Sequence, residues 1–205
     1  MKILIIDYGL GNLASVRRAV EECGGDSLVS ALPADIARAS HLILPGVGAF
    51  ADGMSLLRER GWVEPLKAAV RNDRIPLLGI CLGMQLLADR GDEGGESEGL
   101  GLVSGVVERL RPAGADERIP HVGWNAVHQV CPDPLFAGIP DETDFYFVHS
   151  YAVRPGDPSV VIGTTPYAGD FVSVVRSGSA CGVQFHPEKS VPAGFTLLRN
   201  FLAVS

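Results

Sequence analysis

The stretch Ile75 to Gln85, which reads Ile-Pro-Leu-Leu-Gly-Ile-Cys-Leu-Gly-Met-Gln, decides the fold. Its apolar first half predicts a buried strand from Pro76 to Ile80, and a helix is expected to start at Leu82. Cys81 would then occupy the turn between them. The Gly-x-Cys-x-Gly spacing is typical of a nucleophile elbow, which exposes a reactive side chain at the top of a sheet. On this stretch alone a buried structural cysteine is an equally good interpretation, because free cysteines are among the most buried residues.

Short apolar runs alternate with helical patterns on the amino-terminal side of this stretch. The alternation predicts β-α-β units, and hence a parallel sheet with right-handed crossovers. Asn12 is expected to cap the first helix. The expected strands are Lys2–Asp7, Asp26–Ser30 and His41–Leu44, and the expected helices are Leu13–Cys23, Pro33–Ala39, Met54–Arg60 and Trp62–Arg71.

The pattern changes on the carboxyl-terminal side, where strands follow one another quickly and are expected to pair antiparallel. Between the two halves, the acidic stretch Arg90 to Gly99 is expected to be a solvated loop. We therefore predict one α/β domain over residues 1–205: a mostly parallel central sheet with helices on both faces, extended by antiparallel strands. The later strands are expected at Val106–Leu110, His121–Val130, Asp144–Val153, Val160–Thr165, Phe171–Arg176 and Ala180–Phe185, and the closing helix at Pro192–Ala203.

Charge and composition exclude several classes of function. The 205-residue chain carries 17 Lys and Arg against 24 Asp and Glu, a net charge of −7, so nucleic acid is not expected as a partner. No apolar run approaches a membrane span, and the four apolar residues after Lys2 are too few for a signal peptide, which predicts a cytoplasmic protein without membrane contact. The four cysteines lie far apart with no C-x-x-C pair, so we expect reduced thiols, no metal site and no cofactor.

A reactive cysteine needs a base and a group that orients the base. The segment Val-Gln-Phe-His186-Pro187-Glu188-Lys supplies both. Pro187 favours an extended conformation at His186, and residues i and i+2 of an extended chain point to the same side. His186 and Glu188 are therefore the predicted base and its orienting carboxylate, whereas no other histidine has an acidic residue two positions later.

The size of the pKa shift that a reactive thiol needs favours a histidine beside Cys81. A free thiol has a pKa near ~8.5, and a helix N-terminus stabilises a nearby anion by about 0.3–1 kcal/mol, which is less than about one pKa unit. A helix alone therefore leaves a thiol largely protonated, and a protonated imidazole is needed. Acyl transfer also needs oxyanion donors, for which the Leu82 N–H and the loop Pro45-Gly-Val-Gly48 are candidates.

Together these segments resemble the class I (triad) glutamine amidotransferases, through Gly-Ile-Cys81-Leu-Gly-Met-Gln and Gln-Phe-His186-Pro-Glu188. In that family the cysteine attacks the side-chain amide of glutamine, ammonia leaves, and the glutamyl thioester is hydrolysed to glutamate. The resemblance implies that Cys81 is the nucleophile, His186 the general acid/base and Glu188 its partner. It also implies an oxyanion hole at Val47 and Leu82, and glutamine contacts at Gly48, Gln85, Glu93, Ser150 and Tyr151.

Further motifs narrow the resemblance to a subgroup of that family. They are Asp-Tyr-Gly-Leu-Gly-Asn12-Leu, Pro-His-Val-Gly-Trp124-Asn and His-Pro-Glu-Lys189-Ser. They are similar to the glutaminase subunits that pair, as heterodimers, with a separate (β/α)₈-barrel cyclase in histidine biosynthesis. The resemblance implies that this cyclase makes imidazole glycerol phosphate with ammonia received through an internal channel, and that Asn12, Trp124 and Lys189 face the cyclase.

Two segments depart from the subgroup pattern: Ala168 follows Tyr167 where Gly is expected, and Ser177 to Cys181 is irregular. Both put local turn geometry in question and leave the triad untouched. Three alternatives remain open at this point. They are an amidotransferase subunit serving another synthase, a stand-alone cysteine hydrolase or peptidase, and a non-catalytic binding domain, since a fold does not fix a function.

Overall fold

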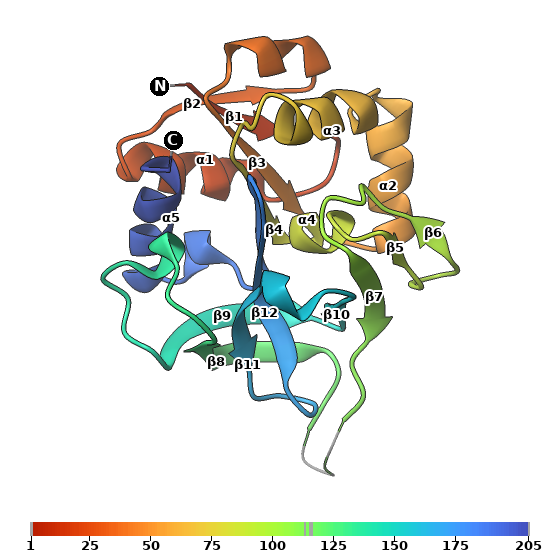
Figure 1. The fold of residues 1–205 in the computed structure, drawn as a ribbon, viewed down its shortest axis with the longest axis vertical. Coiled ribbons are helices and arrows are strands. Elements are labelled where there is room, and N and C mark those ends of the chain that lie inside the picture. The colour runs from red at the N-terminus through yellow and green to blue at the C-terminus, as the bar shows by residue number, and fades with distance from the viewer. Residues whose placement is uncertain (1, 113, 115–116, 205) are drawn as a thin grey trace.

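A nine-stranded sheet runs through the molecule in the computed structural model, which describes residues 2–112, 114 and 117–204 (Figure 1). The strand order is β2-β1-β3-β4-β13-β12-β11-β8-β9. The first five strands pair in parallel and the remainder pair antiparallel, as predicted. The bounds are β1 (Lys2–Ile6), β2 (Asp26–Ser30), β3 (His41–Gly46), β4 (Leu77–Cys81), β8 (His121–Gln129), β9 (Thr143–His149), β11 (Val161–Thr165), β12 (Phe171–Ser177) and β13 (Ala180–Val183).

Helices cover both faces of this sheet, which confirms the predicted fold class. Side chains alternate between two apolar cores, because successive residues of a strand point to opposite faces: Ile3 and Ile5 of β1 lie in one core, and Leu4 and Ile6 in the other. Helices α1 (Leu13–Glu22) and α5 (Ala193–Leu202) cover one face. The other carries η1 (Pro33–Arg38), α2 (Phe50–Glu59), α3 (Val63–Arg71) and α4 (Leu82–Leu86), and the remaining 3₁₀ turns are η2 (Pro134–Phe136), η3 (Pro158–Val160) and η4 (Pro187–Lys189).

A second, four-stranded sheet was not predicted from the sequence. Its order is β10-β7-β5-β6, from β5 (Arg90–Gly91), β6 (Ser97–Glu98), β7 (Gly105–Arg109) and β10 (Tyr151–Pro155). The single strand expected over Asp144–Val153 is therefore wrong, because the chain passes at Ser150 from the large sheet into the small one. The acidic stretch expected to be wholly loop carries two short strands. An apolar run does not reveal a change of sheet, since its alternation continues through the break.

The glycines of the elbow are explained by close backbone contacts. A side chain at Gly79 would lie 2.6 Å from the Gly83 carbonyl oxygen, and one at Gly83 would collide with the Leu44 carbonyl oxygen. Helix α4 can approach β4 at Gly79 and β3 at Gly83 this closely only without Cβ atoms at these two positions. The elbow thus sits at the carboxyl end of β4, between β3 and β13 in the parallel part of the sheet. Within the described residues, no helix is long and apolar enough to cross a membrane.

Candidate active site

The predicted site residues meet around one cavity of about 480 Å³ at the carboxyl ends of the parallel strands. Open α/β sheets bind ligands at this edge, in the crevice outside the carboxyl ends of their strands. Nine predicted residues line the cavity, and Glu188 lies buried behind His186. Those nine are Val47, Gly48, Cys81, Leu82, Gln85, Glu93, Ser150, Tyr151 and His186.

Cys81 occupies the strand–helix turn with a strained backbone. Its φ is +55° and its ψ −111°, a region that residues other than glycine rarely adopt. The conformation ends β4 abruptly and turns the thiol into the cavity, where 7% of the residue remains exposed. The Sγ atom lies 3.8 Å from the Val148 carbonyl oxygen and 3.7 Å from Nε2 of Gln184. Strain of this kind concentrates at functional sites, where the surrounding structure holds it in place.

His186 and Glu188 lie as the i, i+2 spacing predicts. The imidazole Nδ1 is 2.8 Å from Oε1 of Glu188, and the two side chains are 4% and 1% exposed. Ser190 fixes the segment, because its hydroxyl donates to the His186 carbonyl oxygen (2.7 Å) and accepts from the Tyr146 N–H (3.0 Å). Nε2 of His186 makes no hydrogen bond within the described residues, so this nitrogen is free to exchange a proton with a ligand.

The electrostatic surroundings favour a protonated His186. Burial by itself would lower the pKa of the imidazole, but the neighbouring Cys81 sulfur and Glu188 carboxylate outweigh burial and raise the pKa to about 9. His149, which also lines the cavity, behaves differently: burial lowers its pKa to about 3. Of the two imidazoles at the cavity, His186 is therefore the one that carries a proton at neutral pH.

The loop after β3 lies beside the elbow. Gly46 at the end of β3 is the register partner of Cys81, so Val47 and Gly48 follow directly into the cavity wall. Gly48 adopts φ +107°, a conformation that requires glycine in practice. Leu82 begins α4 immediately after the thiol. The backbone of Val47 and Leu82 thus borders the same space from two sides.

The far wall of the cavity is organised around the carbonyl oxygen of Tyr151. This oxygen accepts hydrogen bonds from Nε2 of Gln85 (2.8 Å) and from Nδ1 of His149 (2.9 Å). Ser150 lies at the break between β9 and β10, between His149 and Tyr151, which are joined by this second hydrogen bond. Glu93 also faces the cavity, although one of its oxygens accepts the Phe50 N–H at the start of α2 (2.9 Å). That bond gives Glu93 a structural role at a helix N-terminus besides its place in the cavity wall.

Two polar residues at the site were not singled out from the sequence. Gln184 is fully buried, contacts the Cys81 sulfur and accepts from Gln85, and Ser190 anchors the His186 segment. The sequence did contain a pattern that points to Gln184. This residue lies two positions before His186, and residues two apart in an extended chain point to the same side. No short-range pattern points to Ser190, because its role depends on the distant strand β9.

The three predicted partner-facing residues, Asn12, Trp124 and Lys189, are exposed on the surface. Trp124 is 54% exposed, and its ring packs edge-on against Tyr146, its partner in the β8–β9 register. The Lys189 Nζ lies 5.4 Å from the centre of the same Tyr146 ring. Val122 and Val148 are also exposed and paired on this face, which forms an apolar surface next to the active cavity. Asn12 caps α1, as predicted, by accepting the Ser15 N–H (3.3 Å).

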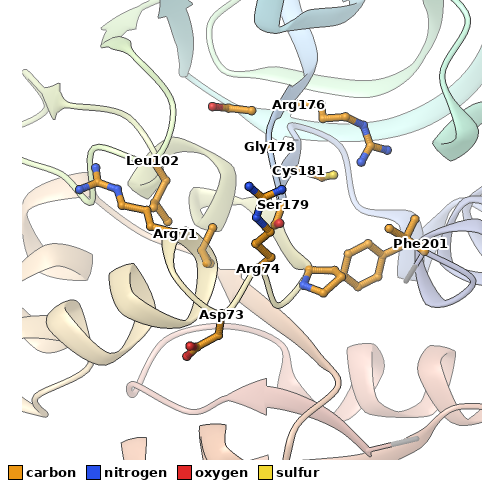
Figure 2. Close-up of a pocket in the computed structure, with 13 residues that line it drawn as sticks. Arg71, Asp73, Arg74, Leu102, Arg176, Gly178, Ser179, Cys181 and Phe201 are labelled. Atoms are coloured by element: carbon orange, nitrogen blue, oxygen red, sulfur yellow. The ribbon is translucent and has the colours of Figure 1, made fainter.

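A larger cavity of about 860 Å³ lies at the opposite edge of the sheet, beside the amino ends of β4 and β13, and contains none of the predicted residues (Figure 2). Its charged groups do not converge on a common point. Arg176 is paired with Asp133, Arg71 donates to the Gly101 carbonyl oxygen, and Asp73 points away from Arg74. This cavity therefore offers no arrangement of groups for catalysis.

The departure at Tyr167-Ala168 has a structural counterpart. Ala168 adopts φ +55°, in the left-handed region that favours glycine, and its N–H donates to Glu117 (3.1 Å). The turn is thus formed although alanine is strained in this conformation, and neither Tyr167 nor Ala168 lines the cavity that holds the thiol. Among the described residues, no group of three or more His, Cys, Asp or Glu side chains is placed to hold a metal ion.

Comparisons with known proteins agree with the fold and with the motifs. A family model described as glutamine amidotransferase class-I matches residues 4–204. The imidazole glycerol phosphate synthase subunit HisH of Moorella thermoacetica is 49% identical over 97% of this chain and 93% of its own length. The subunit of the same name from Dehalococcoides mccartyi is 46% identical over 99% of this chain and 97% of its own.

Solved structures share the fold at lower identity. A crystal structure of a glutamine amidotransferase superposes with a TM-score of 0.77 at 22% identity, covering 98% of this chain and 96% of its own. PurLQS from Thermotoga maritima gives a TM-score of 0.77 at 21% identity, with 98% and 97% covered. From the family match over nearly its whole length, and from relatives of almost 50% identity, this chain belongs to the class-I glutamine amidotransferases and, within them, to the family of HisH subunits.

Proposed function

We propose that this glutamine amidotransferase works as one domain over residues 1–205 that hydrolyses L-glutamine to L-glutamate and ammonia. The observation that carries the proposal is the meeting of Cys81 and His186, backed by Glu188, at one cavity next to the Val47 and Leu82 backbone. Gly48, Gln85, Ser150 and Tyr151 bind the substrate, and Glu93 reaches its ammonium group. The chemistry needs no metal ion or cofactor.

The first half of the reaction forms a thioester. The Cys81 thiolate attacks the amide carbon of glutamine, and the negative charge that develops on the oxygen is stabilised by the N–H groups of Val47 and Leu82. As the C–N bond breaks, protonated His186 gives its proton to the leaving nitrogen, which departs as ammonia. Glu188 holds the imidazole with Nε2 toward the substrate.

The second half returns the enzyme to its starting state. Neutral His186 takes a proton from water, the hydroxyl oxygen attacks the thioester carbon, and the C–S bond breaks. Glutamate leaves, and the thiolate and imidazolium are restored. The same oxyanion donors serve both tetrahedral intermediates.

The ammonia passes to a partner, which we infer to be a (β/α)₈-barrel cyclase that makes imidazole glycerol phosphate and an aminoimidazole carboxamide ribotide in histidine biosynthesis. The support is the name of the relatives and the exposed apolar face formed by Val122, Trp124 and Val148 beside the cavity. Asn12, Trp124 and Lys189 face the partner in this heterodimer. A closed route is required because ammonia that reaches water is protonated and loses its nucleophilicity.

Glutamate release from glutamine, measured with and without the cyclase subunit, tests the proposal. Wild type should be slow alone and much faster with the cyclase and its ligand, and Cys81→Ala should be inactive in both conditions. Cys131→Ala, which removes an exposed free cysteine, is the matched control and should retain full activity. Equal rates for wild type and Cys81→Ala would refute the proposal. Full activity of the isolated chain would refute the part of the proposal that concerns the partner.

A further inference from the structure

A continuous chain of hydrogen bonds joins strand β8, which lies next to the edge strand β9, to Cys81. It begins at Asn125, whose Nδ2 lies 3.4 Å from Nε2 of His121. His121 Nδ1 lies 3.0 Å from His149 Nε2, and His149 Nδ1 lies 2.9 Å from the Tyr151 carbonyl oxygen. Gln85 and Gln184 continue the chain to the Cys81 sulfur.

The histidine part of this chain has one consistent arrangement of protons. The Tyr151 carbonyl oxygen can only accept, so His149 must donate from Nδ1 and, when neutral, accept at Nε2. His121 then donates from Nδ1 and accepts at Nε2. The Asn125 amide is oriented to match, because its oxygen accepts the Ala126 N–H (2.9 Å) and its nitrogen faces His121. Both rings are buried, and burial lowers the pKa of His121 to about 4 and that of His149 to about 3, so both are neutral at pH 7.

The two glutamine amides are oriented by the same logic. Because Tyr151 offers a carbonyl oxygen, the amide nitrogen of Gln85 must face it, and its second N–H points to Oε1 of Gln184 (3.0 Å). Gln184 is thereby turned so that its own nitrogen faces the Cys81 sulfur, 3.7 Å away. A buried amide with its oxygen already occupied can offer the sulfur only a donor.

We propose that Gln184 is a further catalytic residue, whose N–H donates to the Cys81 sulfur and stabilises the thiolate, and that Gln85 is a positioning residue, because its bonds to the Tyr151 carbonyl oxygen and to Oε1 of Gln184 fix the direction of this donation. The inference rests on the proposed glutaminase function for its role in turnover. A hydrogen bond to an ionised acceptor is stronger than a neutral one, so this bond strengthens as the thiol loses its proton. The Tyr8 hydroxyl and the His186 imidazole also interact electrostatically with Cys81, and both remain in every variant below.

Alkylation of Cys81 by iodoacetamide across pH measures the thiolate without requiring turnover. In Gln184→Met, which keeps the length of the side chain and removes the donor, the midpoint of the alkylation curve should move upward by about one to two pH units. With the cyclase subunit present, kcat should fall roughly 10- to 100-fold, while KM for glutamine changes much less. Gln129→Met, on β8, removes a comparable amide, which donates to the Ile139 carbonyl oxygen, and both readouts should stay at wild-type values.

A second variant tests the direction of the chain. Gln85→Met removes the amide that orients Gln184, so the alkylation midpoint should shift in the same direction by a smaller amount. In the double variant with Gln184→Met, the Gln85 change should add nothing, because the donor to the sulfur is already lost.

An unchanged alkylation midpoint in Gln184→Met would overturn the assignment of Gln184, and additive shifts in the double variant would overturn the role of Gln85. A wild-type enzyme that releases no glutamate would refute the glutaminase function alone, because the alkylation arm would still report on Gln184.

Discussion

The backbone is strained at Cys81, the proposed nucleophile. A non-glycine residue at φ +55° and ψ −111° costs about 1–3 kcal/mol, and glycine adopts such angles freely. We therefore expect Cys81→Gly to unfold at higher urea concentration than Cys81→Ala, with a difference of about 1 kcal/mol in the free energy of unfolding. Alanine keeps the Cβ and hence the strain, so the reverse order would show that the turn is relaxed.

His186 sets the upper limit of the active pH range. Its raised pKa of about 9 means that the imidazolium needed to protonate the leaving ammonia is present below that value and is lost as pH rises through it. The rate of thioester formation should therefore fall near pH 9 in wild type. Glu188→Gln removes one of the groups that raise this pKa, so the fall should move to lower pH, and kcat/KM should drop roughly 10²–10⁴-fold. A pH profile of kcat/KM with an unshifted alkaline limb would contradict this role of Glu188.

Strand β12 and the turn η2 are joined by an ion pair on the far side of the molecule from the thiol. Arg176 donates from two nitrogens to the two oxygens of Asp133, both at 2.6 Å, and the side chains are only 22% and 7% exposed. Asp133→Asn keeps the cap on η2 but leaves a mostly buried guanidinium without its carboxylate, which should cost about 3 kcal/mol of unfolding free energy.

The exposed pair Arg18–Glu22 on α1 is the matched control for that ion pair. Its side chains are 82% and 47% exposed, and Glu22→Gln should change stability by less than about 1 kcal/mol. Urea denaturation measures both variants, and glutaminase activity at 25 °C should be unchanged in both. Equal destabilisation would mean that burial adds nothing to the Arg176–Asp133 pair.

Helices and strands that are marked by short sequence patterns could be predicted from the sequence. Strands that depend on pairing with a distant segment of the chain could not. The strand Asp26–Ser30 is confirmed to the residue, and α1 ends one residue before its expected end, because glycines and a cap punctuate the chain there. The β9–β10 break at Ser150 was missed, since its cause is the pairing of β10 with the distant strand β7 in a second sheet. The same division holds in the site: the His186–Glu188 pair follows from spacing, whereas the Ser190 and Tyr151 contacts come from the tertiary fold.

At the scale of the whole molecule, one apolar face adjoins the active cavity. Trp124 is 54% exposed on this face, and aromatic residues of this kind dominate the energy of protein interfaces. Trp124→Ala should weaken binding of the cyclase subunit by at least about tenfold, which corresponds to about 1.4 kcal/mol, and should reduce cyclase-stimulated glutaminase activity. The basal rate of the isolated chain and its stability should change little.

Leu32→Ala is the control for that variant, because Leu32 is 65% exposed and lies at the opposite edge of the sheet, after β2. Isothermal titration with the cyclase measures both variants. If Leu32→Ala weakens the complex as much as Trp124→Ala does, the docking face is assigned to the wrong edge.

The placement of the nucleophile and base on neighbouring central strands has a kinetic consequence. Cys81 ends β4 and His186 follows β13, and these strands are in direct parallel register, Ile80 opposite Val183. Amide hydrogens of such central strands exchange only through the rarest openings of a protein, whereas loop amides exchange through small local ones. Cys81 and His186 are therefore attached to the part of the molecule whose amide hydrogens exchange most slowly. Val47 and Ser150 belong to loops whose amide hydrogens exchange faster. In the proposed function, a partner that accelerates the enzyme without unfolding it can act on the loops of the proposed oxyanion and substrate sites, while the distance between sulfur and imidazole stays fixed.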